Sequence, residues 1–189
     1  MSALAAMIFI MSDRETLLKA INELAVVRGK VTLASGREAD YYVDMRRVTL
    51  DGAAAPLVGR VLRELTKDLD FDAVGGLTMG ADPVAFSMLA AAAAEGDRLD
   101  AFVVRKEAKS HGLHKRIEGA DIKGRRVLVV EDTSTTGGSA LTAVEAVREA
   151  GGEPVAVVVV VDRSTGAEEA VREAGLEYRY AFGVDELEI

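Results

Sequence analysis

The sequence predicts an α/β fold with an open, mostly parallel sheet flanked by helices. Short β-favouring runs alternate with helical segments from about residue 71 onward, which is typical of strand–helix–strand units with right-handed crossovers. One run, Val155 to Val161, is apolar without interruption. A strand of that kind is buried on both faces, so its sheet must be parallel and covered by helices.

The first part of the chain is expected to form a helix, an extended segment and a second helix. A helix is expected from Ser12 to Val27, where apolar side chains recur at helical spacing and Ser12 or Asp13 can cap the first turn. Val31 to Val43 is expected to be extended and broken by a turn at Ser35-Gly36, and Asp51 to Leu69 to form a helix with Pro56 near its first turn.

The remaining elements alternate along the chain. Strands are expected at Phe71–Leu77, Ala101–Arg105, Arg126–Val130, Pro154–Val161 and Tyr178–Phe182, and helices at Pro83–Ala94, Ser139–Ala150 and Thr165–Ala174. Together they predict a single domain over residues 12–189. Residues 1–11 are expected to be an extension that is disordered or weakly packed.

Composition excludes several classes of function. The chain has 189 residues, 49% of them hydrophobic, which is enough for a core without disulfides. It contains no cysteine and only two histidines, His111 and His114, so thiolate catalysis and a zinc–thiolate or histidine-rich metal centre are not expected. The net charge of −8 argues against a general nucleic-acid binder.

No segment predicts membrane insertion or export. Met1 to Met11 is apolar but lacks a basic flank and is too short to span a bilayer. The apolar stretches Val84–Ala94 and Val155–Val161 have the lengths of buried elements. We expect a soluble, cytoplasmic protein that does not bind membranes.

The segment from Arg126 to Ser139 indicates a phosphate site. An apolar strand is expected to end at Glu131-Asp132, small hydroxyl and glycine residues follow, and Ser139 opens a helix. Ligands of open α/β sheets bind at the carboxyl ends of strands, and backbone N–H groups before a helix attract phosphate. The segment is neither a Walker loop nor a dinucleotide fingerprint.

The two carboxylates narrow the choice of ligand. Beside a phosphate they would repel it unless sugar hydroxyls or Mg²⁺ occupied them, so Glu131 and Asp132 favour a phosphorylated sugar with magnesium. The alternative is a tight strand-to-helix turn in which Thr and Ser act only as caps.

A basic loop forms the second feature. From Arg105 to Arg126 the chain carries eight Lys or Arg residues against three acidic ones, a charge of +5 that leaves −13 for the rest. Such a loop suits a small polyanion, and Gly112 and Gly119 would let it close over a ligand. The alternative is a solvated surface loop, to which His114, Lys115 and Arg116 would belong.

These segments resemble the type I phosphoribosyltransferases, which transfer a phosphoribosyl group from 5-phosphoribosyl 1-diphosphate (PRPP). The shared motif is Val127 to Ser139. The loop Arg105-Lys-Glu-Ala-Lys-Ser-His-Gly112 is most similar to that of the orotate phosphoribosyltransferases of pyrimidine (UMP) biosynthesis, supported by Leu33-Ala-Ser-Gly36, Tyr41-Tyr42 and Asp162-Arg163. The resemblance runs from about Ser12 to the C-terminus and implies a small hood at about residues 12–50.

The resemblance also implies roles for individual residues. Glu131 and Asp132 would hold the ribose hydroxyls, and Asp132, a candidate catalytic group, is the one candidate protein ligand of a Mg²⁺ that binds through PRPP. The 5-phosphate would lie against Thr133, Ser134, Thr135, Thr136, Gly137, Gly138 and Ser139. The pyrophosphate would meet Arg105, Lys106, Lys109 and His111, of which Lys109 and His111 would be catalytic. Orotate would contact Thr135, Arg163 and Tyr42.

The resemblance further implies a homodimer that shares the 105–119 loop across its interface. Two departures stand out, because Ala34 and Met79 occupy positions where some members of the family carry lysine. Pyrophosphate binding is therefore expected to depend more heavily on the basic loop.

Three other functions stay open at this stage. The substrate base could be a purine or uracil, the chain could be a PRPP-sensing regulator without catalysis, or it could be a scaffold without a ligand. Lys109 and His111, the residues that would be catalytic, argue against a regulator without catalysis. A scaffold without a ligand would leave the pair Glu131 and Asp132 unexplained.

Overall fold

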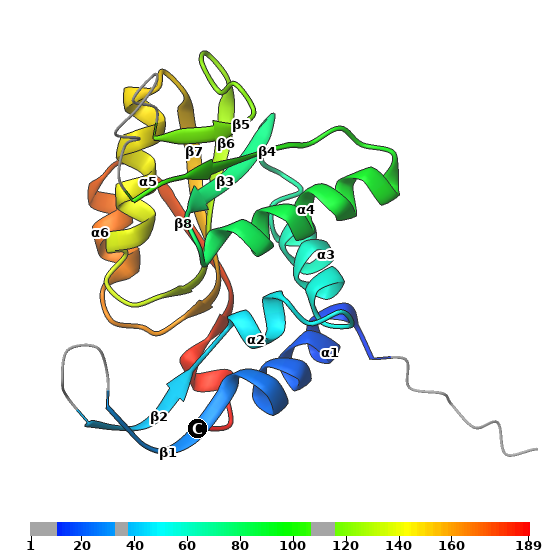
Figure 1. Ribbon diagram of the computed structural model, residues 1–189, viewed down its shortest axis with the longest axis vertical. Coiled ribbons are helices and arrows are strands. Elements are labelled where there is room, and N and C mark those ends of the chain that lie inside the picture. Colours follow the sequence, from blue (N-terminus) through cyan, green and yellow to red (C-terminus); the bar gives the residue numbers. More distant parts are fainter. Residues whose placement is uncertain (1–10, 33–37, 107–115) are drawn as a thin grey trace, which may run out of the picture.

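The centre of the molecule is a six-stranded sheet in the order β5-β4-β3-β6-β7-β8 (Figure 1). The computed structural model describes residues 11–32, 38–106 and 116–189. The strands of this sheet are β3 Ala73–Leu77, β4 Asp100–Val104, β5 Ile117–Gly119, β6 Arg126–Ser134, β7 Glu153–Asp162 and β8 Glu177–Gly183. Neighbouring strands are parallel except β5, which runs antiparallel to β4. The predicted open, mostly parallel sheet is confirmed.

Helices cover both faces of the sheet (Figure 1). They are α3 Ala55–Leu65 and α4 Ala81–Glu95 on one face, and α5 Gly138–Glu149 and α6 Ala167–Glu173 on the other. Strand β6 shows why both faces are apolar. Leu128 and Val130 pack into the core under α3 and α4, whereas Val127 and Val129 pack under α5 and α6. Each buried side chain of this size contributes about 1.5–3 kcal/mol.

The N-terminal segment forms a separate small layer, the hood, which lies below the sheet in Figure 1. It consists of α1 Asp13–Ala20, the π-helical turn η1 Ile21–Ala25, the antiparallel pair β1 Val26–Thr32 and β2 Glu38–Val43, and α2 Arg46–Thr49. Ser12 caps α1 in a capping box, because its hydroxyl accepts from the backbone N–H of Glu15 and its own N–H donates to the Glu15 carboxylate at 2.7 Å.

The C-terminus returns to the hood. After β8 a short 3₁₀ turn, η2 Val184–Glu186, brings the last residues beside α1 (Figure 1). Arg14 donates to the carbonyl of Ala181 at 2.8 Å and to the Glu186 carboxylate at 2.7 Å, and the backbone N–H of Glu188 donates to Asn22 Oδ1 at 2.9 Å. The hood is therefore held by residues from both ends of the chain.

Several predicted boundaries are wrong. The first helical segment ends at Ala25 rather than Val27, and α3 spans less than the predicted 51–69 because Asp51 caps a preceding turn by accepting from the N–H groups of Ala53 and Ala54. Strand β5 and helix α2 were not predicted. The turn at Ser35-Gly36 lies outside the described residues.

The largest boundary error concerns β6. It does not end at Glu131-Asp132 but continues to Ser134, because the long strand β7 pairs with it as far as Asp162. Helix α5 begins at Gly138 rather than Ser139, after Gly137 with a left-handed φ of 78°. The predicted phosphate loop is correspondingly shorter.

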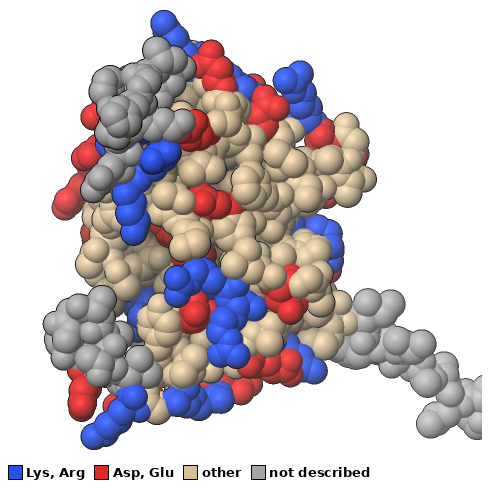
Figure 2. All heavy atoms as spheres, viewed as in Figure 1, with Lys and Arg blue, Asp and Glu red and all other residues tan. Residues whose placement is uncertain are grey.

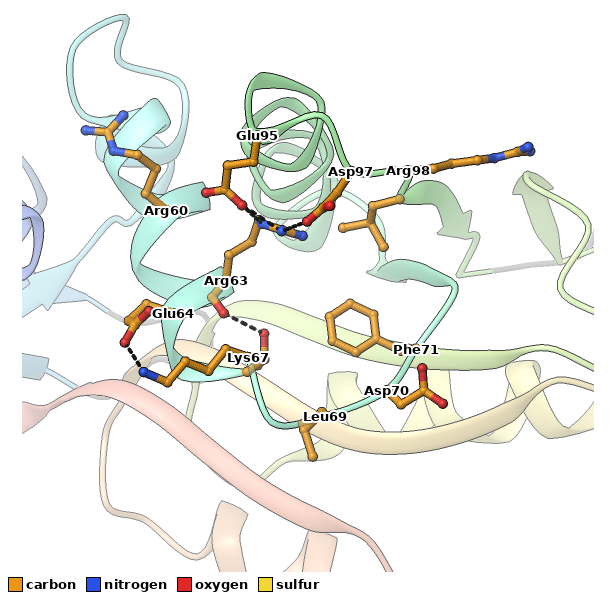
Figure 3. Close-up of a pocket in the computed structure, with 12 residues that line it drawn as sticks. Arg60, Arg63, Glu64, Lys67, Leu69, Asp70, Phe71, Glu95, Asp97 and Arg98 are labelled. Carbon is orange, nitrogen blue, oxygen red and sulfur yellow. Dashed lines mark hydrogen bonds and ion pairs between the residues drawn. The ribbon is translucent and has the colours of Figure 1, made fainter.

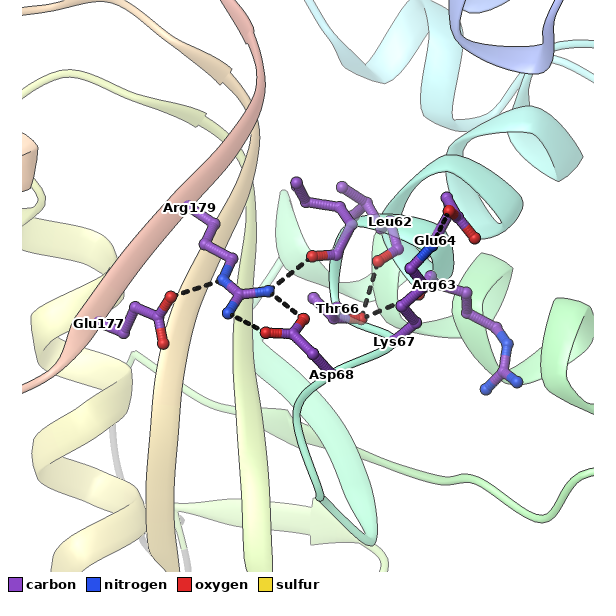
Figure 4. Close-up of polar contacts among 9 residues, drawn as sticks. Leu62, Arg63, Glu64, Thr66, Lys67, Asp68, Glu177 and Arg179 are labelled. Carbon is purple, nitrogen blue, oxygen red and sulfur yellow. Dashed lines mark hydrogen bonds and ion pairs between the residues drawn. The ribbon is translucent and has the colours of Figure 1, made fainter.

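Arg179 fixes the outer strand β8 to the end of α3 (Figure 4). Its Nη atoms donate to the Asp68 carboxylate at 2.6 and 2.8 Å and to the Leu65 carbonyl at 2.8 Å, and its Nε donates to Glu177 at 2.7 Å. The guanidinium lowers the pKa of Asp68 to about 2.

Charges of both signs are dispersed over the surface. On the face in Figure 2, Lys and Arg side chains alternate with Asp and Glu side chains over its described part. Among the described residues, no helix combines the length and apolarity needed to cross a membrane.

Candidate active site

A cavity of about 380 Å³ opens between the hood and the carboxyl ends of β3 and β6. Ligand sites of open α/β sheets occur at this edge. It is lined by Tyr42, Val43, Asp44, Met45, Arg46, Leu77, Thr78, Met79, Gly80, Lys106, Glu131, Asp132, Thr133, Thr135, Ser139 and Arg163. The structure thus brings together residues that the sequence predicted from four separate segments.

The acidic pair Glu131 and Asp132 lies at the base of this cavity. The preceding residues of β6, Val127 to Val130, are buried in the core and fix the position of the pair. Glu131 is only 6% exposed. Burial, followed by repulsion from Asp132, raises the pKa of Glu131 to about 8. Burial also raises the pKa of Asp132, although the backbone N–H of Thr133 donates to its carboxylate at 2.7 Å. Two buried acids in contact favour a ligand that donates hydrogen bonds or carries positive charge.

Gly80 makes close approach to this pair possible. A Cβ at Gly80 would lie 2.6 Å from Glu131 Oε1 and 2.7 Å from Asp132 Oδ1, so any side chain would displace the carboxylates. The preceding peptide bond, Thr78–Met79, is cis, and the Thr78 hydroxyl donates to Asp82 Oδ2 at 2.7 Å. Sequence reasoning missed Gly80; its signal was a glycine three residues after the end of a predicted strand.

The predicted phosphate-binding residues divide into two groups. Thr133, Thr135 and Ser139 line the cavity. Ser134 is buried, at 4% exposure, and lies with Tyr178 and Asp162 in a polar cluster in which the Tyr178 hydroxyl donates to Asp162 at 3.0 Å. Thr136, Gly137 and Gly138 form the turn into α5 and do not line the cavity. The first-turn N–H groups of α5, a 12-residue helix, are free of intrahelical partners and suit a phosphate.

The residues predicted to meet orotate share the same cavity. Tyr42, Thr135 and Arg163 all line it. The Arg163 guanidinium lies over the Tyr41 ring at 5.3 Å, and its backbone N–H donates to the Ser134 carbonyl at 3.0 Å. This contact between β7 and the hood places a fixed cation at the cavity wall.

The basic loop is described only at its two ends. Lys106 lines the active-site cavity and, with Arg105, Thr78 and Glu118, a neighbouring cavity of about 640 Å³. Arg105 forms an ion pair with Glu118 at 3.6 Å. The predicted residues Lys109 and His111 lie outside the described residues.

Asp44 and Arg46 were not predicted as site residues. Arg46 is the first residue of α2, and its Nε donates to Asp44 Oδ1 at 2.9 Å at the cavity wall. No sequence motif marks them, since only the placement of the hood over the sheet brings them to the acidic pair.

Another cavity, of about 520 Å³, lies at the C-terminal ends of α3 and α4 (Figure 3). Its charges neutralise one another. Arg63 bonds the carboxylates of Glu95, at 2.7 Å, and Asp97, and Lys67 pairs with Glu64. None of the predicted site residues lines it.

Sequence and structure comparisons identify the class of protein. The family model of the phosphoribosyl transferase domain matches residues 48–174. The orotate phosphoribosyltransferase of Streptomyces coelicolor is 73% identical over 175 residues, covering 92% of this chain and 96% of that protein. The enzyme of Mycobacterium tuberculosis is 58% identical over 175 residues, covering 93% and 96%.

A solved structure agrees with these relatives. The crystal structure of Mycobacterium tuberculosis orotate phosphoribosyltransferase in complex with PRPP matches with a TM-score of 0.83 and 54% identity, over 94% of this chain and 100% of that one. The chain belongs to the orotate phosphoribosyltransferases, which are pentosyl-transferring glycosyltransferases.

Proposed function

We propose that the chain transfers the 5-phosphoribosyl group of PRPP to N1 of orotate, giving orotidine 5′-phosphate and diphosphate. The observation that carries this proposal is the cavity itself. It joins a buried acidic pair, a helix N-terminus after a short loop, and a fixed arginine, Arg163. These groups suit, in turn, ribose hydroxyls, a phosphate and the carboxylate of an anionic pyrimidine.

Catalysis rests on position and charge. The C1–O bond to diphosphate breaks, C1 becomes cationic in the transition state, and N1 of orotate forms the new bond as its proton is released. Glu131 and Asp132 hold the ribose hydroxyls, whose hydrogen bonds favour the ionised carboxylates, and the resulting negative charge lies beside the developing cation. Positioning of two reactants can supply about 7–11 kcal/mol of a barrier, so no protein nucleophile is required.

The leaving diphosphate needs neutralisation. Arg105 and Lys106, at the described end of the basic loop, lie beside the cavity, and we assign Lys109 and His111 to the same task. Either of these two can stabilise or protonate the departing oxygen. Closure of the loop excludes water and so protects PRPP from hydrolysis.

Magnesium fits this chemistry as a substrate-borne ion. The described residues contain no cluster of three or more His, Cys, Asp or Glu that could hold a metal by itself. Mg²⁺ commonly binds through one or two carboxylates together with substrate phosphates, so Asp132 is its candidate protein ligand and PRPP supplies the other oxygens. When bound, the ion neutralises diphosphate charge.

The biological setting follows from the family. We propose a cytoplasmic homodimer in pyrimidine (UMP) biosynthesis that shares the 105–119 loop between subunits. These features stay predictions. Sedimentation of the purified chain would test the dimer.

One assay tests the proposed reaction. Purified protein is mixed with PRPP, MgCl₂ and orotate, and the loss of orotate absorbance is followed beside adenine, hypoxanthine and uracil controls. We expect turnover of orotate alone, and its suppression by EDTA with recovery on added Mg²⁺. Turnover of another base without orotate would reassign the substrate, and PRPP binding without turnover of any base would favour the regulator.

A further inference from the structure

We propose that Arg46 binds the diphosphate group of PRPP and so supplies a positive charge from the hood. This inference rests on the proposed function and extends it to a residue that no motif marks. It concerns substrate binding at the described cavity and is independent of the basic loop.

The position of Arg46 is the first argument. Helix α2, which Arg46 opens, packs against α4, and α4 begins directly after the Thr78–Gly80 turn. Arg46 and this turn line one cavity together with the acidic pair. The cation therefore lies at the part of the cavity bounded by β3, the turn and the hood.

The orientation of the guanidinium is the second argument. Its Nε donates to Asp44 Oδ1 at 2.9 Å, and Asp44 is itself anchored by its backbone N–H, which donates to the Ala25 carbonyl at 3.0 Å. Within the described part of the chain, these two bonds hold Nε of the guanidinium and leave both Nη atoms for a ligand. A planar guanidinium with two free nitrogens matches the geometry of phosphate oxygens.

Charge balance is the third argument. The cavity wall carries three carboxylates, those of Asp44, Glu131 and Asp132, and a diphosphate entering beside them meets repulsion. The charge of Arg46 opposes the rise that burial causes in the pKa of Asp132, so it reaches the acidic pair and screens the pair from an approaching anion. The turn Thr78–Gly80 at the same wall carries no charged side chain, and its Met79 is 63% exposed.

Of the other groups at the cavity, Arg163 and the start of α5 are assigned to the orotate carboxylate and the 5-phosphate, whereas Lys106 shares the diphosphate with Arg46. Arg163 lies over Tyr41 and is bonded through its backbone to Ser134, next to the loop that suits the 5-phosphate. The start of α5 offers N–H groups to that phosphate. Arg46 is the cation that the hood adds to the acidic pair, and the diphosphate is the remaining charged group of PRPP.

The test compares Arg46→Ala and Arg46→Gln with Arg47→Ala. Arg47 is the next residue of the same helix, is exposed, and does not line the cavity, so its loss changes the net charge equally. Calorimetric titrations use PRPP, inorganic diphosphate and ribose 5-phosphate, each with Mg²⁺. Melting temperatures verify that the variants are folded.

We expect both Arg46 variants to bind PRPP and diphosphate about ten- to a hundredfold more weakly, the loss typical of a hydrogen bond to a charged group. Ribose 5-phosphate binding, and the KM for orotate at saturating PRPP, should match wild type. Arg46→Lys should recover part of the affinity. Arg46→Ala binding diphosphate as tightly as Arg47→Ala would overturn the inference while leaving the proposed function intact. Failure of the wild-type protein to bind PRPP would overturn both.

Discussion

The active-site cavity and the cavity at the ends of α3 and α4 differ in how their charges are paired. The cavity at the ends of α3 and α4 is larger, at about 520 Å³ against 380 Å³, and is lined by more ionisable side chains. There Arg63 lies between Glu95 and Asp97, and Lys67 lies on Glu64 (Figure 3). In the active-site cavity, Glu131 and Asp132 lie against each other.

The difference shows that unfavourable pairing, rather than the number of charges, distinguishes a ligand site. Exposed ion pairs satisfy themselves and contribute about 0–1 kcal/mol each. Two buried acids in contact disfavour ionisation until a ligand provides hydroxyl donors or a cation. The pKa values of the acidic pair are therefore raised, whereas that of Asp68, in its exposed pair with Arg179, is lowered.

The largest effect is expected from Lys109 of the basic loop. Lys109→Ala should lower kcat by at least about a hundredfold, the usual cost of removing a group that stabilises transition-state charge. The melting temperature should stay at the wild-type value. Lys115→Ala, in the same basic loop, is the matched control and should retain wild-type turnover. Near-normal turnover of Lys109→Ala would refute its catalytic role.

A smaller effect is expected from the contact between the Thr78–Gly80 turn and the acidic pair. Gly80→Ala places a methyl group within 2.6 Å of Glu131 Oε1. Because a displacement of about 1 Å in a catalytic group can cost up to a hundredfold in rate, we expect kcat/KM to fall by about ten- to a hundredfold. Gly52→Ala, which meets nothing within 4 Å, should be neutral. Equal activity of the two variants would mean that the acids tolerate displacement.

The pH dependence of stability tests the acidic pair directly. The pKa of Glu131 is raised from 4.5 to about 8 in the folded protein. Its contribution to stability is therefore complete below pH 4.5 and is lost as the pH rises through about 8. Relative to wild type without ligand, Glu131→Gln should gain on the order of 10 °C in melting temperature between pH 5 and pH 8, since this pKa difference is worth about 3–4 kcal/mol over that range and 1 kcal/mol shifts a domain of this size by about 2–4 °C. Parallel melting curves would contradict the raised pKa.

The smallest effect is expected at the cavity between the ends of α3 and α4, which Arg63 lines. Arg63→Ala breaks the contacts with Glu95 and Asp97 and should lower the free energy of unfolding by about 1 kcal/mol or less, as for other surface ion pairs. kcat and the KM values for PRPP and orotate should be unchanged. Steady-state kinetics and denaturant unfolding of the same variant measure the two effects. A loss of activity without a loss of stability would show that this cavity also takes part in function.

Elements with strong local patterns could be predicted from the sequence. The apolar run that forms β7 and the alternation of strands and helices led to the correct sheet type. Boundaries were predicted less well, because pairing decides them: β7 extends β6 to Ser134, and Asp51 delays the start of α3. Strand β5 was missed because Ile117–Gly119 is too short to carry a pattern.

The site was predicted where one continuous segment carries it. Glu131, Asp132, Thr133, Thr135 and Ser139 line the cavity, whereas Ser134, Thr136, Gly137 and Gly138 do not. The extended β6 turns the Ser134 side chain into the cluster with Tyr178. Gly80 and Arg46 were missed, since each matters only through residues distant in the sequence.

The sequence by itself therefore determined the fold class, the acidic pair near the end of β6, the short loop before α5 and the positive charge of the basic loop, because periodicity and local chemistry lie within single segments. Only the tertiary structure decided that the hood, tied to the C-terminus through Arg14 and Glu186, carries Arg46 to the acidic pair. It also decided that Gly80 touches those acids. Contacts between distant segments depend on the topology of the chain and on packing, which no local sequence pattern predicts.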